Sequence, residues 1–323
     1  MYLKDTYKQG SAQLLNFWKN RAGKNLQAGL SISHGHLSVA VVDRQNKDKP
    51  SIISLAALPC NNAKEKDASL LAACKQFQLD KIPCVFVLDT DDYSLIQTEA
   101  PNVEKDELKS ALRWSIKDML DFHIDDATLD AFELPRPTRQ GISQMIYAVA
   151  ARSSLVKATV DPLLDAGIKL STMDINEMVL HNIAATQAES DEDITATCFG
   201  LEGESYIVIS SRNQIYLCRH IADNLWQSSP QFTDNAEPVK NYDLLALEIQ
   251  RSLDYYESHY GKGAVSRLLI FHGDGDTPEP DSFFQVPTRR IDLKQFIDGL
   301  SGYSPNEIMA CLPALGGALR VSQ

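Results

Sequence analysis

The stretch LEIQRSLDYYES, residues Leu247 to Ser258, has the spacing of an amphipathic helix with two different faces. Glu248, Arg251 and Tyr255 recur at steps of three and four and form a polar stripe that core packing does not require. An apolar side chain also returns every three or four residues, which predicts one buried face made by Leu245, Ile249, Leu253, Tyr256 and Tyr260. The helix is therefore expected to pack on one side and to make specific polar contacts on the other.

This helix resembles the EIQRSLDFF helix of the PilM-like proteins, the actin-fold cytoplasmic components of type IV pilus assembly. Three further segments match that family in the same order: a helix around Lys105 to Phe122, the stretch from Ala148 to Asp174, and the closing LPALGGALR at Leu312 to Arg320. The resemblance spans roughly Leu26 to Arg320. Within the family, the chain most resembles the MshI branch, of the mannose-sensitive haemagglutinin (MSHA) pilus, because its phosphate loops are weak and it has no apolar membrane span.

The composition is typical of a globular protein with two lobes. The chain has 323 residues, of which 44% are hydrophobic and 23% charged. Its 31 basic and 43 acidic residues give a net charge of -12, which opposes nonspecific attraction to nucleic acid or anionic lipid. We expect no nucleic-acid partner.

The cysteines and the hydropathy pattern predict a cytoplasmic protein. Six cysteines form no CxxC pair and read as small core residues in a reducing compartment. No apolar stretch approaches the roughly 18 to 20 residues that cross a bilayer, and the N-terminus lacks a signal-peptide core. The family resemblance implies a place at the inner face of the inner membrane.

Residues 1–26 are a basic N-terminal extension that stands out from the acidic chain. A short helix from Ser11 to Arg21 would carry Leu14, Leu15, Phe17 and Trp18. Such a helix could rest on a membrane surface or a partner, or pack on the protein's own lobe, and the sequence leaves these alternatives open.

A three-stranded unit occurs twice in the chain. Alternating apolar residues predict strands on both sides of a turn at Ser33 to His36, with a third strand at Ser51 to Leu55. The same layout returns at Thr195 to Phe199, Tyr206 to Ser210 and Gln214 to Cys218. Further strands are expected at Cys84 to Leu88 and Arg267 to Phe271. Hairpin pairs also occur in unrelated folds, so the resemblance is needed to interpret this repeat.

Together with the resemblance, the repeat predicts an α/β, actin-like (duplicated ribonuclease-H-like) two-lobed fold with an inserted α+β subdomain in lobe one. The expected division is 27–92 and 169–190 for the lobe one core, 93–168 for the insert, and 191–323 for lobe two, with 226–264 as its helical part.

The insert is expected to hold three strands and one helix. The strands are predicted at Ser94 to Thr98, near Ala131 to Leu134 and at Met145 to Ala150. The helix should begin at Asn102 as its N-cap and bury Leu108, Leu112, Ile116, Met119 and Leu120. A separate segment, the loop from Asp223 to Lys240, is expected to be mobile.

The first phosphate turn of the family, GIDIGSSSVK, corresponds to Gly29 to Ser38 here. Actin-like enzymes use glycine amides and a strand-borne aspartate at this turn to hold ATP and a hydrated magnesium ion. Here the aspartate position is Ser31, the glycine position Ser33 and the lysine position Ser38, while Gly35 remains in the turn. We expect no ATP hydrolysis and no catalytic residue.

The other two nucleotide elements are also weak. Glu202 stands at the glycine position of the second turn and would repel phosphates by about a few kcal/mol. The degenerate cleft candidates outside the first turn are Gly203, Glu204, Ser205, Glu248, Arg251, Gly273 and Gly275. Asp174 or Glu204 would restore the ATPase interpretation if either reached the cleft. For Glu248 and Arg251 two roles are open. We favour an ion pair that stabilises the helix over a position at the edge of an interlobe cleft, which the resemblance implies.

Other chemical sites are not favoured. His34 and His36 flank a glycine, but no third ligand is evident, so a solvated turn is preferred over zinc. The pair Asp91-Asp92 and the run Ser190 to Asp193 read as solvated acidic loops. We expect no metal site.

The resemblance implies a non-enzymatic assembly-platform protein that binds the short N-terminal tail of a PilN-like or MshJ-like inner-membrane partner, in a groove of lobe one beside the insert. Candidate groove residues, placed by position, are Leu95, Gln97, Arg113, Trp114 and Lys117. The alternatives are an actin-like switch or ATPase that uses ATP with Mg, and a related protein of type II secretion. Self-association is left open.

Overall fold

The computed structural model describes residues 25–46, 49–104, 106–138, 141–201, 204–221, 228–229, 239–240, 242–261, 263–271 and 286–321. Most of the basic extension and of the loop from Asp223 to Lys240 lies outside this part of the chain, and so do Glu202, Gly203, Gly273 and Gly275. Within the described residues, no helix is long and apolar enough to cross a bilayer.

Lobe one is built on a five-stranded mixed sheet in the order β3-β2-β1-β4-β8. The strand β1 pairs antiparallel with β2 and parallel with β4, which in turn pairs parallel with β8. The strands are β1 (Leu26–Ser33), β2 (His36–Asp43), β3 (Ser51–Pro59), β4 (Cys84–Val87) and β8 (Leu170–Asp174). The predicted hairpin and third strand are confirmed.

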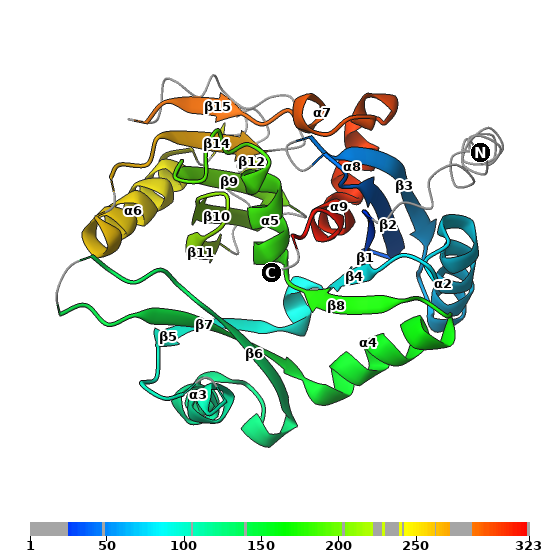
Figure 1. The fold of residues 1–323 in the computed structure, drawn as a ribbon, viewed down its shortest axis with the longest axis horizontal. Helices are drawn as coiled ribbons and strands as arrows, with labels where there is room; N and C mark the ends of the chain where they lie inside the picture. The colour runs from blue at the N-terminus through cyan, green and yellow to red at the C-terminus, as the bar shows by residue number, and fades with distance from the viewer. Residues whose placement is uncertain are drawn as a thin grey trace.

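Lobe two repeats this arrangement in the order β11-β10-β9-β14-β15 (Figure 1). Its first three strands are again antiparallel, and β14 and β15 again run parallel to the first strand. The strands are β9 (Thr195–Leu201), β10 (Glu204–Ser210), β11 (Ile215–Ile221), β14 (Arg267–Phe271) and β15 (Thr288–Arg290). The structure thus confirms the predicted repeat of topology. A short pair, β12 (Ser228–Ser229) and β13 (Val239–Lys240), stands apart.

Helices cover both faces of each sheet. The helices α2 (Ala63–Phe77) and α4 (Ser153–Asp165) pack on one face of the lobe one sheet, and α6 (Tyr242–Tyr260) packs on lobe two. The five residues predicted for the buried face of α6 are all buried. Between the lobes lie α5 (Asn176–Ala185) and α9 (Leu312–Ala318), and one apolar core runs from Ala40 through both helices to Phe199 (Figure 1). The lobes therefore share a core.

The remaining elements are short. They are the helices α7 (Leu293–Phe296) and α8 (Pro305–Ala310) and the 3-10 turns at Thr90–Asp92, Lys117–Met119, Ile124–Asp126 and Leu300–Gly302.

Two helices contact lobe one although the predicted division places them elsewhere. The helix α4 was assigned to the insert, but Leu163 at its end and Ile168 just after it belong to the lobe one core. The helix α9 was assigned to lobe two, yet it lies directly on β1, because a Cβ on Gly29 would stand 1.8 Å from the carbonyl oxygen of Ala314. Glycine and alanine allow this approach, so the chain returns to lobe one at its end.

The insert is a three-stranded antiparallel sheet in the order β5-β7-β6, formed by β5 (Ser94–Glu99), β6 (Ala127–Glu133) and β7 (Met145–Arg152). One face of the sheet, with Ile96, Ile146 and Ala148, packs on the helix α3 (Leu108–Ile116). The opposite face, with Leu95 and Tyr147, packs on the core that the two lobes share. The insert sheet is therefore covered on both sides.

The predicted start of the insert's helix was wrong. Turns are formed at Pro101 to Val103 and between Glu104 and Glu107, and α3 begins only at Leu108, so Asn102 is not its N-cap. Leu112 and Ile116 are buried as predicted, and Leu108 and Leu120 are partly buried. Met119 is 60% exposed, because the helix ends at Ile116 and a 3-10 turn breaks the periodicity.

Candidate functional site

The first turn places Ser31 in the interior of lobe one. Ser31 stands opposite Ser38 across the hairpin, and its buried hydroxyl has no hydrogen-bond partner among the described residues. The neighbouring Ser38 hydroxyl donates to the carbonyl oxygen of Ala310, 2.7 Å away. A neutral hydroxyl at Ser31 cannot supply the charge that a strand-borne aspartate gives to a hydrated magnesium ion.

The tip of this hairpin is a two-residue turn at His34 and Gly35, both with positive φ, of 47° and 74°. The positive φ favours glycine at position 35, and a Cβ there would also displace the side-chain oxygen of Asn61, 2.4 Å away. Ser33 is partly buried at the end of β1. The first turn is thus a tight hairpin whose candidate residues Ser31 and Ser33 are uncharged.

At the second turn, the carboxylate of Glu204 binds two groups of its own lobe. It accepts a hydrogen bond from the Tyr206 hydroxyl at 2.7 Å and lies 2.8 Å from Nε2 of His220. The rings of Tyr206 and His220 are stacked, with centroids 4.8 Å apart. Ser205, the next candidate, is fully buried. Glu204 is therefore already engaged by protein groups.

Asp174, the other carboxylate that would restore the ATPase interpretation, is engaged as well. It ends β8, is 4% exposed, and its Oδ2 lies 2.7 Å from Nη1 of Arg320. Burial raises the pKa of Asp174, and the guanidinium of Arg320 opposes that rise. No sequence pattern links Arg320, just after the last helix, with the end of this strand.

A second buried carboxylate, Glu177, was missed by the sequence reasoning. Its Oε2 accepts a hydrogen bond from the Tyr93 hydroxyl at 2.6 Å, and that hydroxyl also accepts from the backbone N–H of Asn176. Thr90, three residues before Tyr93, shares a side-chain hydrogen bond with Tyr206 of lobe two. The sequence feature that could have pointed to Glu177 is its position as a charged residue in the first turn of the apolar helix α5. These contacts join lobe one, α5 and lobe two.

The polar stripe on α6 braces lobe two. Glu248 pairs with Arg251 at 2.5 Å along the helix and with Arg219 of β11 at 3.1 Å. Tyr255 reaches further, because its hydroxyl accepts a hydrogen bond from Gln97 of the insert at 3.0 Å. The stripe thus makes contacts within lobe two and between lobe two and the insert.

The candidate partner residues do not converge on one groove. Leu95 and Gln97 lie on the face of the insert sheet that meets the lobes. Arg113 bonds the carbonyl oxygens of Ile124 and Ala127, at 2.6 and 3.0 Å, and so has a structural role.

Trp114 and Lys117 lie on α3 and the turn that follows it. Trp114 is 74% exposed, and the ammonium of Lys117 lies 5.0 Å from its ring centroid. These two residues are the accessible members of the set.

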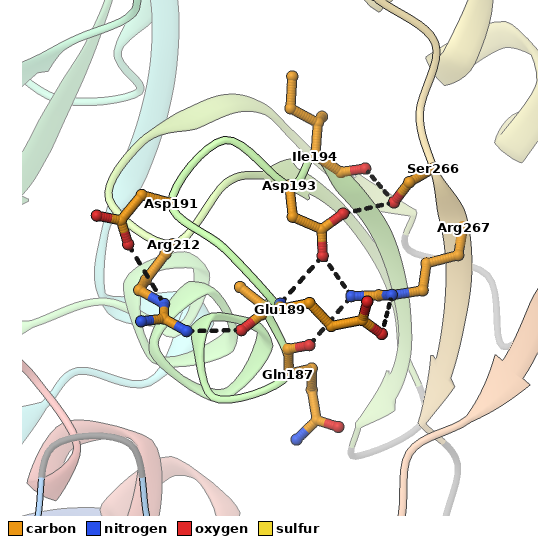
Figure 2. A network of polar contacts seen from close by, with 9 residues as sticks. Gln187, Glu189, Asp191, Asp193, Ile194, Arg212, Ser266 and Arg267 are labelled. Carbon is orange, nitrogen blue, oxygen red and sulfur yellow. Dashed lines mark hydrogen bonds and ion pairs between the residues drawn. The ribbon is translucent and has the colours of Figure 1, made fainter.

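The acidic run Ser190 to Asp193 is exposed from Ser190 to Glu192, as interpreted, but Asp193 at its end is held by an arginine (Figure 2). Arg267 pairs with Asp193 and, at 2.6 Å, with Glu189. Arg212 donates to the carbonyl oxygen of Ala188 at 2.7 Å. The connection from α5 to β9 is therefore fixed to lobe two. The described residues contain no group of three His, Cys, Asp or Glu side chains that could hold a metal ion.

No protein-family model and no curated protein matches the sequence. The structure is similar to a chain of the PilM-PilN type IV pilus biogenesis complex, with a TM-score of 0.64 and 16% identity over 93% of this chain and 98% of that one. It is also similar to the cytoplasmic domain of EpsL, an inner membrane component of the type II secretion system of Vibrio cholerae. That match has a TM-score of 0.50 and 12% identity, and it covers 89% of this chain and 94% of that one. With the repeated sheets, these likenesses show an actin-like two-lobed fold.

Proposed function

We propose that this chain is a PilM-like assembly-platform protein of a type IV pilus, of the MSHA kind, and that it works without nucleotide turnover. In this proposal it binds the cytoplasmic tail of a PilN-like or MshJ-like protein and is held by that partner at the inner face of the inner membrane. The observation that carries the proposal is the likeness to a chain of the PilM-PilN complex, which extends over 93% of this chain and therefore includes most of the insert.

The chemistry of the turns supports a role without ATP hydrolysis. Ser31 brings no charge to the first turn, and the carboxylates of Asp174 and Glu204 are each held by a cationic or hydroxyl group of the protein. A hydrated cation at either carboxylate would have to replace its present ion pair or hydrogen bond.

The partner contact is assigned to the exposed side of the insert. Of the five candidate residues, Trp114 and Lys117 are the two whose side chains are available to another molecule. An exposed tryptophan with an adjacent cation is the kind of anchor that dominates small interfaces.

The test is the fluorescence anisotropy of a labelled peptide, the N-terminal cytoplasmic tail of the PilN-like protein from the same organism, titrated with the purified chain. We expect saturable binding, and Trp114→Ala should weaken it by about ten-fold or more. Leu71→Ala removes another exposed apolar side chain, 46% exposed on α2, and should leave binding unchanged.

The outcomes separate the function from its site. If no tail peptide binds the wild-type chain, the assembly role is contradicted. If the peptide binds equally well to the Trp114 and Leu71 variants, the role stands and the assigned face is wrong.

The likeness to EpsL makes type II secretion the second candidate. Its lower TM-score and identity favour the pilus assignment. Stronger binding of the tail of a type II secretion membrane protein than of the PilN-like tail would reverse this order.

A further inference from the structure

The hydroxyl of Tyr147 fastens the insert to the edge strand of lobe two. It donates to the carbonyl oxygen of Cys218 at 2.9 Å and accepts from the N–H of the same residue at 3.1 Å. Cys218 lies on β11, the outer strand of the lobe two sheet, where backbone groups lack a neighbouring strand on one side. Tyr147 is 3% exposed, so water cannot easily replace this hydroxyl.

Two more hydrogen bonds join the insert to lobe two, one from β5 and one from the loop between β6 and β7. Gln97 of β5 donates to the Tyr255 hydroxyl at 3.0 Å, and the Thr138 hydroxyl donates to the carbonyl oxygen of Tyr260 at the end of α6. In the ribbon, the insert sheet runs beneath β11 and α6 while its two ends continue into lobe one (Figure 1). The insert is thus covalently connected to lobe one at both ends and hydrogen-bonded to lobe two.

We propose that the insert is a strap that holds lobe two in one arrangement relative to lobe one, with the Tyr147 hydroxyl as its main fastening. The lobes of a two-lobed protein can rotate about their junction only if every link across it yields. A molecule that pulls the insert away from β11 removes one of these links and so loosens lobe two, and one that stabilises the contact keeps the link in place. This inference does not depend on the identity of the partner.

The strap makes a specific prediction for hydrogen exchange of the full chain. Tyr147→Phe keeps the ring but leaves the N–H and C=O of Cys218 without their partner. Exchange at the Cys218 amide should become roughly ten-fold faster. If the strap holds the lobes, the amides of α5, which lies between them, should also exchange faster, by a similar factor.

Tyr303→Phe is the matched control, because its hydroxyl accepts one hydrogen bond from the N–H of Leu55 inside lobe one. It should speed exchange at Leu55 and leave Cys218 and α5 unchanged. Tyr255→Phe provides a milder variant that removes only the bond from Gln97, and it should speed exchange in β5 and α5 to a smaller extent.

Faster exchange at Cys218 alone, with α5 unaffected, would overturn the proposal, because the bond would then be only local. Equal acceleration of α5 in the Tyr303 control would also overturn it, since general destabilisation would explain the result. If Tyr147→Phe does not fold, an unchanged α5 in Tyr255→Phe counts against the strap.

Discussion

At the scale of single residues, three described positions proposed for a nucleotide cleft carry either no charge or a charge that is already paired. Ser31 is neutral, and Asp174 and Glu204 are held by Arg320 and by His220 with Tyr206. The identity of Ser31 could be read directly from the sequence. The pairing of the two carboxylates could not, because Asp174 and Arg320 are 146 positions apart (320 minus 174) and meet only through the fold.

Glu177 gives a pH prediction at this scale. Burial raises its pKa above the ordinary 4.5, and the hydrogen bond from Tyr93 opposes the rise. Because the folded chain then binds the proton more tightly than the unfolded chain, ionised Glu177 costs stability at neutral pH. That cost is relieved as the pH falls through the folded pKa toward 4.5.

Glu177→Gln removes this titration and keeps an oxygen that can accept from Tyr93. We expect the variant to match or exceed the wild type in free energy of unfolding at about pH 7.5, and the wild type to gain on it as the pH falls toward about 4.5. Urea unfolding at several pH values measures both. A difference that stays constant with pH, or a wild-type advantage at neutral pH that disappears on acidification, would refute the assigned cause.

At the scale of elements, local periodicity predicted what depends on neighbours in sequence. The buried face of α6 and the strands of both hairpins follow from spacing alone. The start of α3 did not, because the residues from Asn102 to Glu107 favour turns as well as helix N-termini. The candidate partner residues were predicted to line one groove but lie on two sides of the insert, because the sequence does not say which face of its sheet meets lobe two.

The contact of α9 with β1 carries the prediction at this scale. Gly29→Ala would place a Cβ against the backbone of Ala314, and the helix must shift to admit it. We expect a loss of about 1 to 3 kcal/mol in the free energy of unfolding, the usual range for overpacking. Gly302→Ala is the control, because a Cβ there would meet nothing within 4 Å. Equal urea midpoints for the two variants would show that α9 does not lie tightly on β1.

At the scale of the whole molecule, the two lobes are joined by a shared apolar core, by the polar contacts around Tyr93 and by the insert. Each of these links restricts rotation of one lobe on the other. An actin-like switch needs that rotation to respond to nucleotide, whereas an assembly platform needs a fixed surface for its partner. The arrangement is therefore better suited to the proposed platform.

The most direct test of this account is the melting temperature of the purified chain, titrated with ATP and magnesium up to several millimolar. A ligand that binds only the folded state must raise the melting temperature, by an amount set by its concentration relative to its dissociation constant. We predict no shift with Mg-ATP and a clear rise with the PilN-like tail peptide. A saturable rise with Mg-ATP, abolished by a negative charge introduced at the first turn such as Ser33→Glu, would contradict the central claim that the chain works without nucleotide.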